Sequence, residues 1–126
     1  MTKTVIYSNN APEPIGPYSQ AILHGNMLFV SGQIALDAET GNLLTSDIET
    51  ETNQVMKNIG EVLKAAGMEY NNILKTSIFL KDMNSFPVVN ETYGKYFQHA
   101  FPARETVEVA KLPKNVNVEI SCIAVK

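Results

Sequence analysis

The segment that decides the fold of this chain is Phe101–Lys126, FPARETVEVAKLPKNVNVEISCIAVK. Residues 105–109 alternate between polar and apolar side chains, and residues 116–125 are rich in Val and Ile, which are both patterns of β-strands. Pro113 stands between the two stretches and cannot donate a hydrogen bond to a β-ladder. The segment therefore predicts two strands that are separated by a short break.

The second of these strands carries a charged side chain between apolar neighbours. Because successive side chains point to opposite faces of a strand, one face receives Val118, Ile120, Cys122 and Ala124. The other face receives Glu119, together with Asn117, Ser121, Ile123 and Val125. We expect the first face to join the core, with Cys122 as a small core residue. We expect the mixed second face to be covered by something other than that core.

Two amphipathic helices are predicted upstream of this segment. The first spans 48–66, where residues recur at the spacing of one helical face: Ile48, Thr52, Val55, Ile59, Val62, Leu63 and Ala66. Ser46 or Asp47 can cap its beginning, and Gly67 suits its end. The second helix begins near Asn84 and accommodates Pro87 in its first turn. It is expected to bury Phe86, Val89, Tyr93, Tyr96 and Phe97.

The remaining elements are strands, which we expect at 4–7, 18–24, 27–33 and 73–81. Gly25-Asn26 between two apolar runs predicts a β-hairpin. The order is strands, helix, strand, helix and two strands. It predicts a single α+β domain that spans the whole chain, in which two helices pack on one face of a sheet of about six strands.

Composition narrows the classes of function. A net charge of −3 and the lack of a Lys/Arg block give no electrostatic signal for nucleic acid or a membrane surface. The N-terminus lacks the apolar core of a signal peptide, and no apolar run approaches the roughly 20 residues of a transmembrane helix. The single cysteine excludes an internal disulfide, and with the distant His24 and His99 it offers no metal-ligand spacing. We therefore expect a cytoplasmic protein without a bound metal.

Two charged residues are the leading candidates for chemistry. Arg104, at the start of a strand, offers a planar fork of donors that matches a carboxylate, although an ordinary surface arginine explains it too. Glu119 can orient or deprotonate a water, or it can be a solvated residue on an open sheet face. The weaker candidates are Tyr18, Ser31, Gly32 and Asn90, and each of them also has an ordinary structural explanation.

Several short motifs, spread over essentially the whole chain, resemble those of the Rid (reactive intermediate deaminase, or YjgF) family. They are Gly16-Pro17-Tyr18-Ser19-Gln20-Ala21, Ser31-Gly32-Gln33-Ile34, Val89-Asn90-Glu91-Thr92-Tyr93, and Pro102-Ala103-Arg104 followed by Val107, Leu112 and Val118-Glu119-Ile120. The resemblance implies a chorismate-mutase-like fold with a mixed sheet. It also implies a homotrimer in which three sheets close around a shared axis and each site lies between subunits.

The activity that the resemblance implies is hydrolysis of reactive 2-imino acids to 2-oxo acids and ammonia, without a cofactor. The implied substrates are 2-iminopropanoate and 2-iminobutanoate with their enamine tautomers, which pyridoxal-phosphate-dependent serine and threonine dehydratases release. Arg104 then binds the substrate carboxylate, and Glu119 positions the attacking water. Backbone groups near Thr106 contact the imino nitrogen, and the pocket is shaped by Tyr18, Ser31, Gly32 and Asn90.

Two positions depart from the pattern of that family. Thr106 stands where cysteine is frequent, which matters little because deamination needs no thiol. Glu105 stands where a small residue is usual. Alternation points its side chain away from Arg104, yet a nearby negative charge could weaken anion binding.

The placement of Arg104 and Glu119 favours a site that two chains share. If the last two strands formed a hairpin around Pro113, Arg104 would lie opposite Ile123, about 13 Å along the strand from Glu119. The fold that the resemblance implies places another strand between them instead.

Two other functions stay open. One is a non-enzymatic sensor that binds small carboxylates through Arg104 and regulates a partner protein. The other is RNA cleavage, as in some members of the family, which the acidic charge disfavours.

Overall fold

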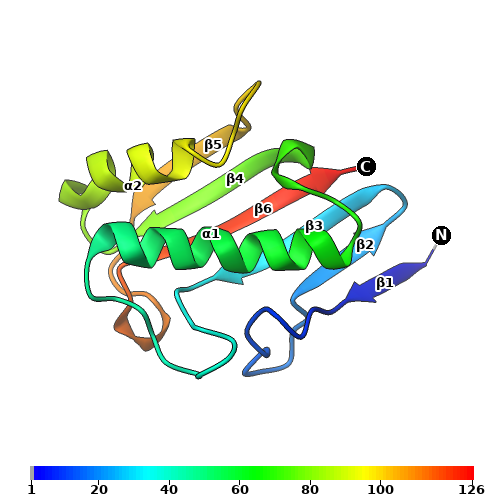
Figure 1. Cartoon of the computed structure of the whole chain (residues 1–126), viewed down its shortest axis with the longest axis horizontal. Helices are drawn as coiled ribbons and strands as arrows, with labels where there is room; N and C mark the ends of the chain where they lie inside the picture. The colour runs from blue at the N-terminus through cyan, green and yellow to red at the C-terminus, as the bar shows by residue number, and fades with distance from the viewer. Residues whose placement is uncertain (1) are drawn as a thin grey trace.

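Six strands form one mixed sheet with the order β1-β2-β3-β6-β4-β5 in the computed structural model, which describes residues 2–126. The strands are β1 (Lys3–Ile6), β2 (Ala21–His24), β3 (Met27–Gln33), β4 (Ile73–Leu80), β5 (Ala103–Glu108) and β6 (Val118–Val125). Two α-helices, α1 (Ile48–Ala65) and α2 (Phe86–Gly94), lie on the same face of this sheet (Figure 1). The predicted α+β fold is confirmed.

The last strand lies in the middle of the sheet. β6 pairs with β3 on one side and with β4 on the other, and both pairs are antiparallel. β4 and β5 are parallel and are connected through α2, whereas β1, β2 and β3 form an antiparallel meander. The predicted hairpin between β2 and β3 is confirmed, and Gly25 adopts φ 63° in its turn. β5 and β6 are therefore separated by β4, so they do not form a hairpin.

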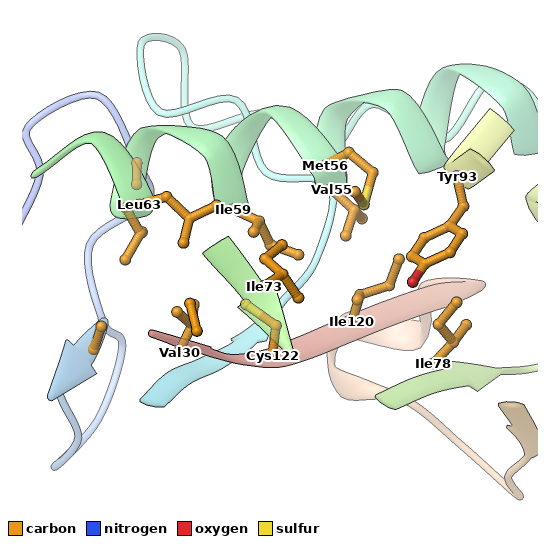
Figure 2. Packing of buried hydrophobic residues seen from close by; sticks show 14 of the residues in the cluster. Val30, Val55, Met56, Ile59, Leu63, Ile73, Ile78, Tyr93, Ile120 and Cys122 are labelled. Atoms are coloured by element: carbon orange, nitrogen blue, oxygen red, sulfur yellow. The ribbon is translucent and has the colours of Figure 1, made fainter. Parts of the chain in front are cut away.

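The core lies between α1 and the sheet (Figure 2). α1 contributes a stripe of fully buried side chains, which are Val55, Met56, Ile59, Val62 and Leu63. They face buried residues of the central strands, among them Leu28, Val30, Ile78, Ile120 and Cys122. Burial raises the pKa of the Cys122 thiol to about 12, so this residue is a neutral part of the core, as predicted.

The ends of α1 follow the sequence signals. Asp47 is the N-cap: its backbone is extended, and its carboxylate accepts a 2.8 Å hydrogen bond from the backbone N–H of Thr50. This bond lowers the pKa of Asp47. After the last turn Gly67 adopts φ 73°, a left-handed conformation that glycine tolerates best.

The second helix is shorter than predicted. Residues 83–85 form a 3-10 turn, and α2 begins at Phe86, because the side chain of Asp82 accepts a hydrogen bond from the backbone N–H of Asn84. Tyr96 and Phe97, which were predicted within the helix, follow its end at Gly94. Phe97 is nevertheless buried against Tyr93, with 4.9 Å between the ring centroids.

The alternation predicted for the last strand is confirmed from Val118 to Val125, with Glu119 on the face away from the helices. Asn117, predicted on that same face, was placed wrongly. It precedes β6, and its side-chain amide donates a 2.8 Å hydrogen bond to Oε1 of Glu51 in α1. Oε2 of the fully buried Glu51 also accepts from the backbone N–H groups of Asn117 (2.7 Å) and Val118 (3.0 Å). Glu51 thus joins α1 to the beginning of β6.

The strand predicted at 18–24 begins only at Ala21, because Gln20 holds the preceding loop. The buried side chain of Gln20 accepts from the backbone N–H of Ser8 (2.7 Å) and donates to the carbonyl of Pro12 (2.9 Å). The other predicted strand ends lie within two residues of the observed ones.

The face of the sheet that carries no helix is mixed in character. An apolar row crosses it through Val5, Ile22, Phe29 and Ile123, of which Val5 is 60% and Phe29 46% exposed. Polar side chains follow on the strands beyond. We still predict that this face is covered by something other than the main core. Among residues 2–126, no helix combines the length and the apolar character needed to cross a membrane.

Candidate active site

Arg104 is the only arginine of the chain, and it lies near the start of β5 at the edge of the sheet. Its register partner in β4 is Thr76, whose side chain contacts α2, so Arg104 lies on the same face as α2. The guanidinium donates a 2.8 Å hydrogen bond from Nη1 to Oδ1 of Asn90. Its central carbon lies 5.5 Å from the ring centroid of Phe86 and 5.3 Å from that of Tyr93. Residues 86, 90 and 93 share one face of α2, and that face contacts the guanidinium.

The charge of Arg104 is not neutralised by a carboxylate. In the described part of the chain the ion pairs are Lys64–Glu61 and Lys75–Glu105, and neither includes Arg104. Asn90 and Phe86 are uncharged, and burial raises the pKa of the Tyr93 phenol, which is therefore neutral at pH 7. An exposed, uncompensated guanidinium is suited to bidentate binding of an anion.

An open cleft of about 440 Å³ lies next to this guanidinium. Its lining consists of Asn90, Tyr93, Gly94, Phe101, Pro102 and Arg104. Arg104 is the one charged residue among them. Apolar walls with a few fixed polar groups are typical of small-molecule sites, so the cleft is suited to a small carboxylate.

The edge of β5 adds backbone groups to the same region. The N–H of Val109 donates to the carbonyl of Leu80 in β4 at 2.9 Å, so the odd-numbered residues of β5 direct their backbone groups toward β4. The N–H and C=O groups of Arg104 and Thr106 then point to the free edge of the sheet. The hydroxyl of Thr106 is buried and has no hydrogen-bond partner among residues 2–126.

Glu119 lies on the opposite face of the sheet, against an irregularity in β3. The β3–β6 register shifts between Val30 and Gln33, so Ser31 and Gly32 form a bulge beside Glu119. A side chain at position 32 would place its Cβ 2.7 Å from Oε2 of Glu119, which is too close. The position therefore requires glycine, unless the carboxylate is displaced. Glu119 is half-buried, and this burial raises its pKa above the ordinary 4.5.

A second, narrower cavity of about 70 Å³ adjoins Glu119, and Tyr18 and Gly32 are among its lining residues. The Tyr18 ring is 51% exposed, and its hydroxyl accepts a weak 3.4 Å hydrogen bond from the backbone N–H of Ile15. The Ser31 hydroxyl donates a 2.6 Å hydrogen bond to the carbonyl of Ser19, which holds the segment before β2 against the bulge.

The structure thus separates the predicted site residues into two groups. Asn90, Arg104 and Thr106 lie at the α2 side of the β5 edge, whereas the other group gathers around Glu119 and contains Tyr18, Ser31 and Gly32. In the sheet, Arg104 is the register partner of Thr76, and Glu119 is the register partner of Phe79. Thr76 and Phe79 are three residues apart along β4. Two strand spacings and three residues of rise put their Cα atoms about 14 Å apart. Their side chains also leave opposite faces of the sheet.

Comparison with known proteins identifies the family of the chain. A family model described as Endoribonuclease L-PSP matches residues 8–126. The chain belongs to this family. Mouse 2-iminobutanoate/2-iminopropanoate deaminase is 47% identical over 124 residues, which cover 98% of this chain and 92% of the relative.

Solved structures agree with this assignment. The crystal structure of a protein of the conserved Rid protein family from Yersinia pestis has a TM-score of 0.97 and 49% identity, and covers 99% of this chain and 100% of its own. The crystal structure of E. coli TdcF with bound serine has a TM-score of 0.94 and 37% identity, and covers 98% of both chains. The predicted resemblance to the Rid family is confirmed.

In this L-PSP family member, Glu105 points away from Arg104, as alternation predicts. It accepts a hydrogen bond from the Ser77 hydroxyl and lies 3.1 Å from Nζ of Lys75 on the open face of the sheet. The Ser77 hydrogen bond and Lys75 together lower the pKa of Glu105. Its charge is therefore balanced locally, on the face of the sheet away from the guanidinium.

Sequence reasoning did not assign Phe86, Tyr93 or Glu51 to the surroundings of the site. Phe86 and Tyr93 were interpreted as core residues, and their spacing to Asn90 at i, i+4 and i+7 was the signal that all three share one helical face. The signal for Glu51 is a carboxylate at position i−4 from Val55, on the apolar stripe of α1, where only a hydrogen-bonded charge is tolerated.

Proposed function

We propose that this protein hydrolyses reactive 2-imino acids, such as 2-iminopropanoate and 2-iminobutanoate and their enamine tautomers, to 2-oxo acids and ammonia. The observation that carries the proposal is the uncompensated guanidinium of Arg104 in an otherwise uncharged cleft of substrate size. The similarity to a mouse protein named for this deamination supports it. So does the similarity to TdcF, a structure with bound serine, which carries a carboxylate.

The chemistry needs a carboxylate clamp, a water and proton transfer. Arg104 holds the substrate carboxylate through paired N–H donors, and the free backbone groups of Arg104 and Thr106 contact the imino nitrogen. Glu119 orients a water that adds to C2 of the C=N bond, while a proton passes to the nitrogen. The hydroxyl proton of the resulting carbinolamine then passes to the amino nitrogen as the C–N bond breaks, and the 2-oxo acid and ammonia leave. No electrons are exchanged, so the reaction requires no redox cofactor.

Burial of Glu119 suits it to this role. Its raised pKa makes the carboxylate a better proton acceptor than a solvated glutamate. Gly32 leaves room for the carboxylate, and the narrow cavity with Tyr18 can admit a water beside it. Ser31 shapes the pocket by holding the segment before β2, and Asn90 shapes it by holding the Arg104 guanidinium.

We further propose that each site is shared between two chains of a homotrimer. A small imino acid cannot touch Arg104 and Glu119 of one chain, because the two Cα atoms are about 14 Å apart and the side chains leave opposite faces of the sheet. A neighbouring chain that packs on the open, partly apolar face would bring its own Arg104 edge toward Glu119. Heterologous contacts of this kind close into a ring with equivalent sites.

Activity is tested by coupling a threonine dehydratase to this protein and following 2-oxobutanoate while semicarbazide competes for the imine. Faster formation of the 2-oxo acid, and less semicarbazone, is expected. Arg104→Ala should abolish the effect. Binding of 2-oxobutanoate without any acceleration would refute the enzyme and favour a carboxylate sensor. RNA cleavage, which the family description names, is disfavoured by the net charge of −3.

The shared site is tested with two inactive proteins, Arg104→Ala and Glu119→Ala, which are unfolded and refolded together in equal amounts. Random assembly makes about three-quarters of the trimers mixed, and each mixed ring contains one intact interface in three. About a quarter of wild-type activity should return. No recovery, with mixed trimers demonstrated by native mass spectrometry, would rule out a site between chains.

A further inference from the structure

The guanidinium of Arg104 is surrounded on the α2 side by groups that fix its direction without neutralising it. The Phe86 and Tyr93 rings lie 5.5 and 5.3 Å from its central carbon, and Oδ1 of Asn90 accepts its Nη1–H at 2.8 Å. A carboxylate in place of any of these would hold the arginine more strongly, but would also consume the charge that an anionic ligand needs. Aromatic faces attract a cation through the ring quadrupole and leave its N–H donors free.

Tyr93 is itself held firmly. Only 3% of this residue is exposed, and its ring packs on that of Phe97. Its hydroxyl shares a 2.8 Å hydrogen bond with the Thr76 hydroxyl in β4, and Thr76 is the register partner of Arg104 in the sheet. The ring and the arginine are therefore both anchored at the same level of β4, one through a hydroxyl and the other through the backbone ladder.

We propose that Tyr93, together with Phe86, is a positioning residue that aims the Arg104 guanidinium into the cleft and keeps its charge available for a carboxylate. Burial against Phe97 holds the ring, the Thr76–Tyr93 hydrogen bond adds to this, and the ring fixes the cation. Without the ring, a long flexible arginine at an exposed sheet edge samples many rotamers, and each ligand must then restrict them on binding. Loss of Tyr93 should therefore weaken ligand binding through Arg104 rather than through direct ligand contacts.

The inference rests on the proposed function only in taking a carboxylate as the ligand. Its first test needs no ligand, because the chain has one arginine and its side-chain NMR signals belong to Arg104 alone. In the wild-type protein, selectively labelled with ¹⁵N-arginine, the rings should shift the Nε–Hε proton away from its value in a free peptide. Tyr93→Leu should move this signal toward the free-peptide value. The matched control is Tyr96→Leu, which removes another tyrosine of this region, one that bonds Asn53 rather than contacting Arg104.

The second test measures the dissociation constant of 2-oxobutanoate by calorimetry. Tyr93→Leu should weaken binding about tenfold, as expected when the ligand must itself order one long side chain, and should raise KM more than it lowers kcat. Tyr93→Phe keeps the ring and loses only the Thr76 bond, so it should stay within about threefold of the wild type. Tyr96→Leu should bind like the wild type.

The two tests separate the inference from the proposed function. An unmoved arginine signal in folded Tyr93→Leu, or an equal movement in Tyr96→Leu, overturns the positioning role. A signal that moves as expected in a protein that neither binds 2-oxobutanoate nor deaminates supports the positioning role and refutes the proposed carboxylate site. Equal weakening in Tyr93→Leu and Tyr93→Phe would assign the effect to the hydroxyl and overturn the role of the ring.

Discussion

Replacing Glu51 by alanine tests how the α1 helix holds the strand that carries Glu119. The buried carboxylate of Glu51 accepts three hydrogen bonds, from the backbone and side chain of Asn117 and from the backbone of Val118. Val118 is fully buried, so its N–H cannot reach water when the acceptor is removed, whereas Asn117 is only half-buried and can be rehydrated in part.

The expected loss of stability follows from the donors of these two residues. An orphaned buried donor costs about 1–3 kcal/mol, so about 2 kcal/mol for Val118 and about 1 kcal/mol for Asn117 give a loss of about 3 kcal/mol. With an unfolding entropy of about 2.1 cal/mol/K per residue, this lowers the melting temperature of a 126-residue chain by about 11 °C. Glu51→Gln keeps one acceptor oxygen and should lose about half as much.

The assay is thermal unfolding followed by circular dichroism at one fixed protein concentration, so that any oligomer contributes equally. Glu49→Ala is the matched control, because Glu49 is an exposed glutamate in the first turn of the same helix. It should shift the melting temperature by only about 2 °C, as expected for a surface charge near a helix N-terminus. A Glu51→Ala protein that melts within error of Glu49→Ala would show that water replaces the carboxylate, and the reasoning would be refuted.

Three further predictions concern the site. Gly32→Ala should reduce deamination about a hundredfold with little change in melting temperature, because the new Cβ at 2.7 Å displaces only the end of the Glu119 side chain; wild-type turnover would contradict this. Glu119→Gln should be more stable than the wild type at pH 7 but not at pH 4. Burial raises the folded-state pKa of Glu119 above 4.5, so the stability that comes from the protonated carboxyl is present below that pH and is lost as the pH rises and the buried group ionises. Urea midpoints of the two proteins that differ equally at both pH values would refute this. Glu105→Ala should change the dissociation constant of 2-oxobutanoate by less than about twofold, because Lys75 balances the Glu105 charge on the other face of the sheet; calorimetry that shows tenfold tighter binding would show that Arg104 does sense it.

Local patterns were sufficient to predict the elements and their faces. The period of the apolar residues in α1 depends only on helix geometry, so its buried stripe could be named from the sequence, and Asp47 and Gly67 could be identified at its ends. Alternation in β6 placed Glu119 on the open face for the same reason, since a strand has a period of two whatever its neighbours are. Where a side chain or cap adds a local constraint, as at Gln20 and Asp82, the predicted ends shifted by a few residues.

The composition of the site was decided by tertiary structure. No local pattern states which strands pair, and the position of β4 between β5 and β6 separates Arg104 from Glu119 by two strand spacings. Their side chains also leave opposite faces of the sheet. The contacts of Arg104 with Phe86 and Tyr93, and those of Glu51 with Asn117 and Val118, join residues that are distant in the chain. Propensity and period describe how a segment meets its own neighbours, whereas these contacts depend on long-range packing, which is specified only when all the elements bury their apolar faces together.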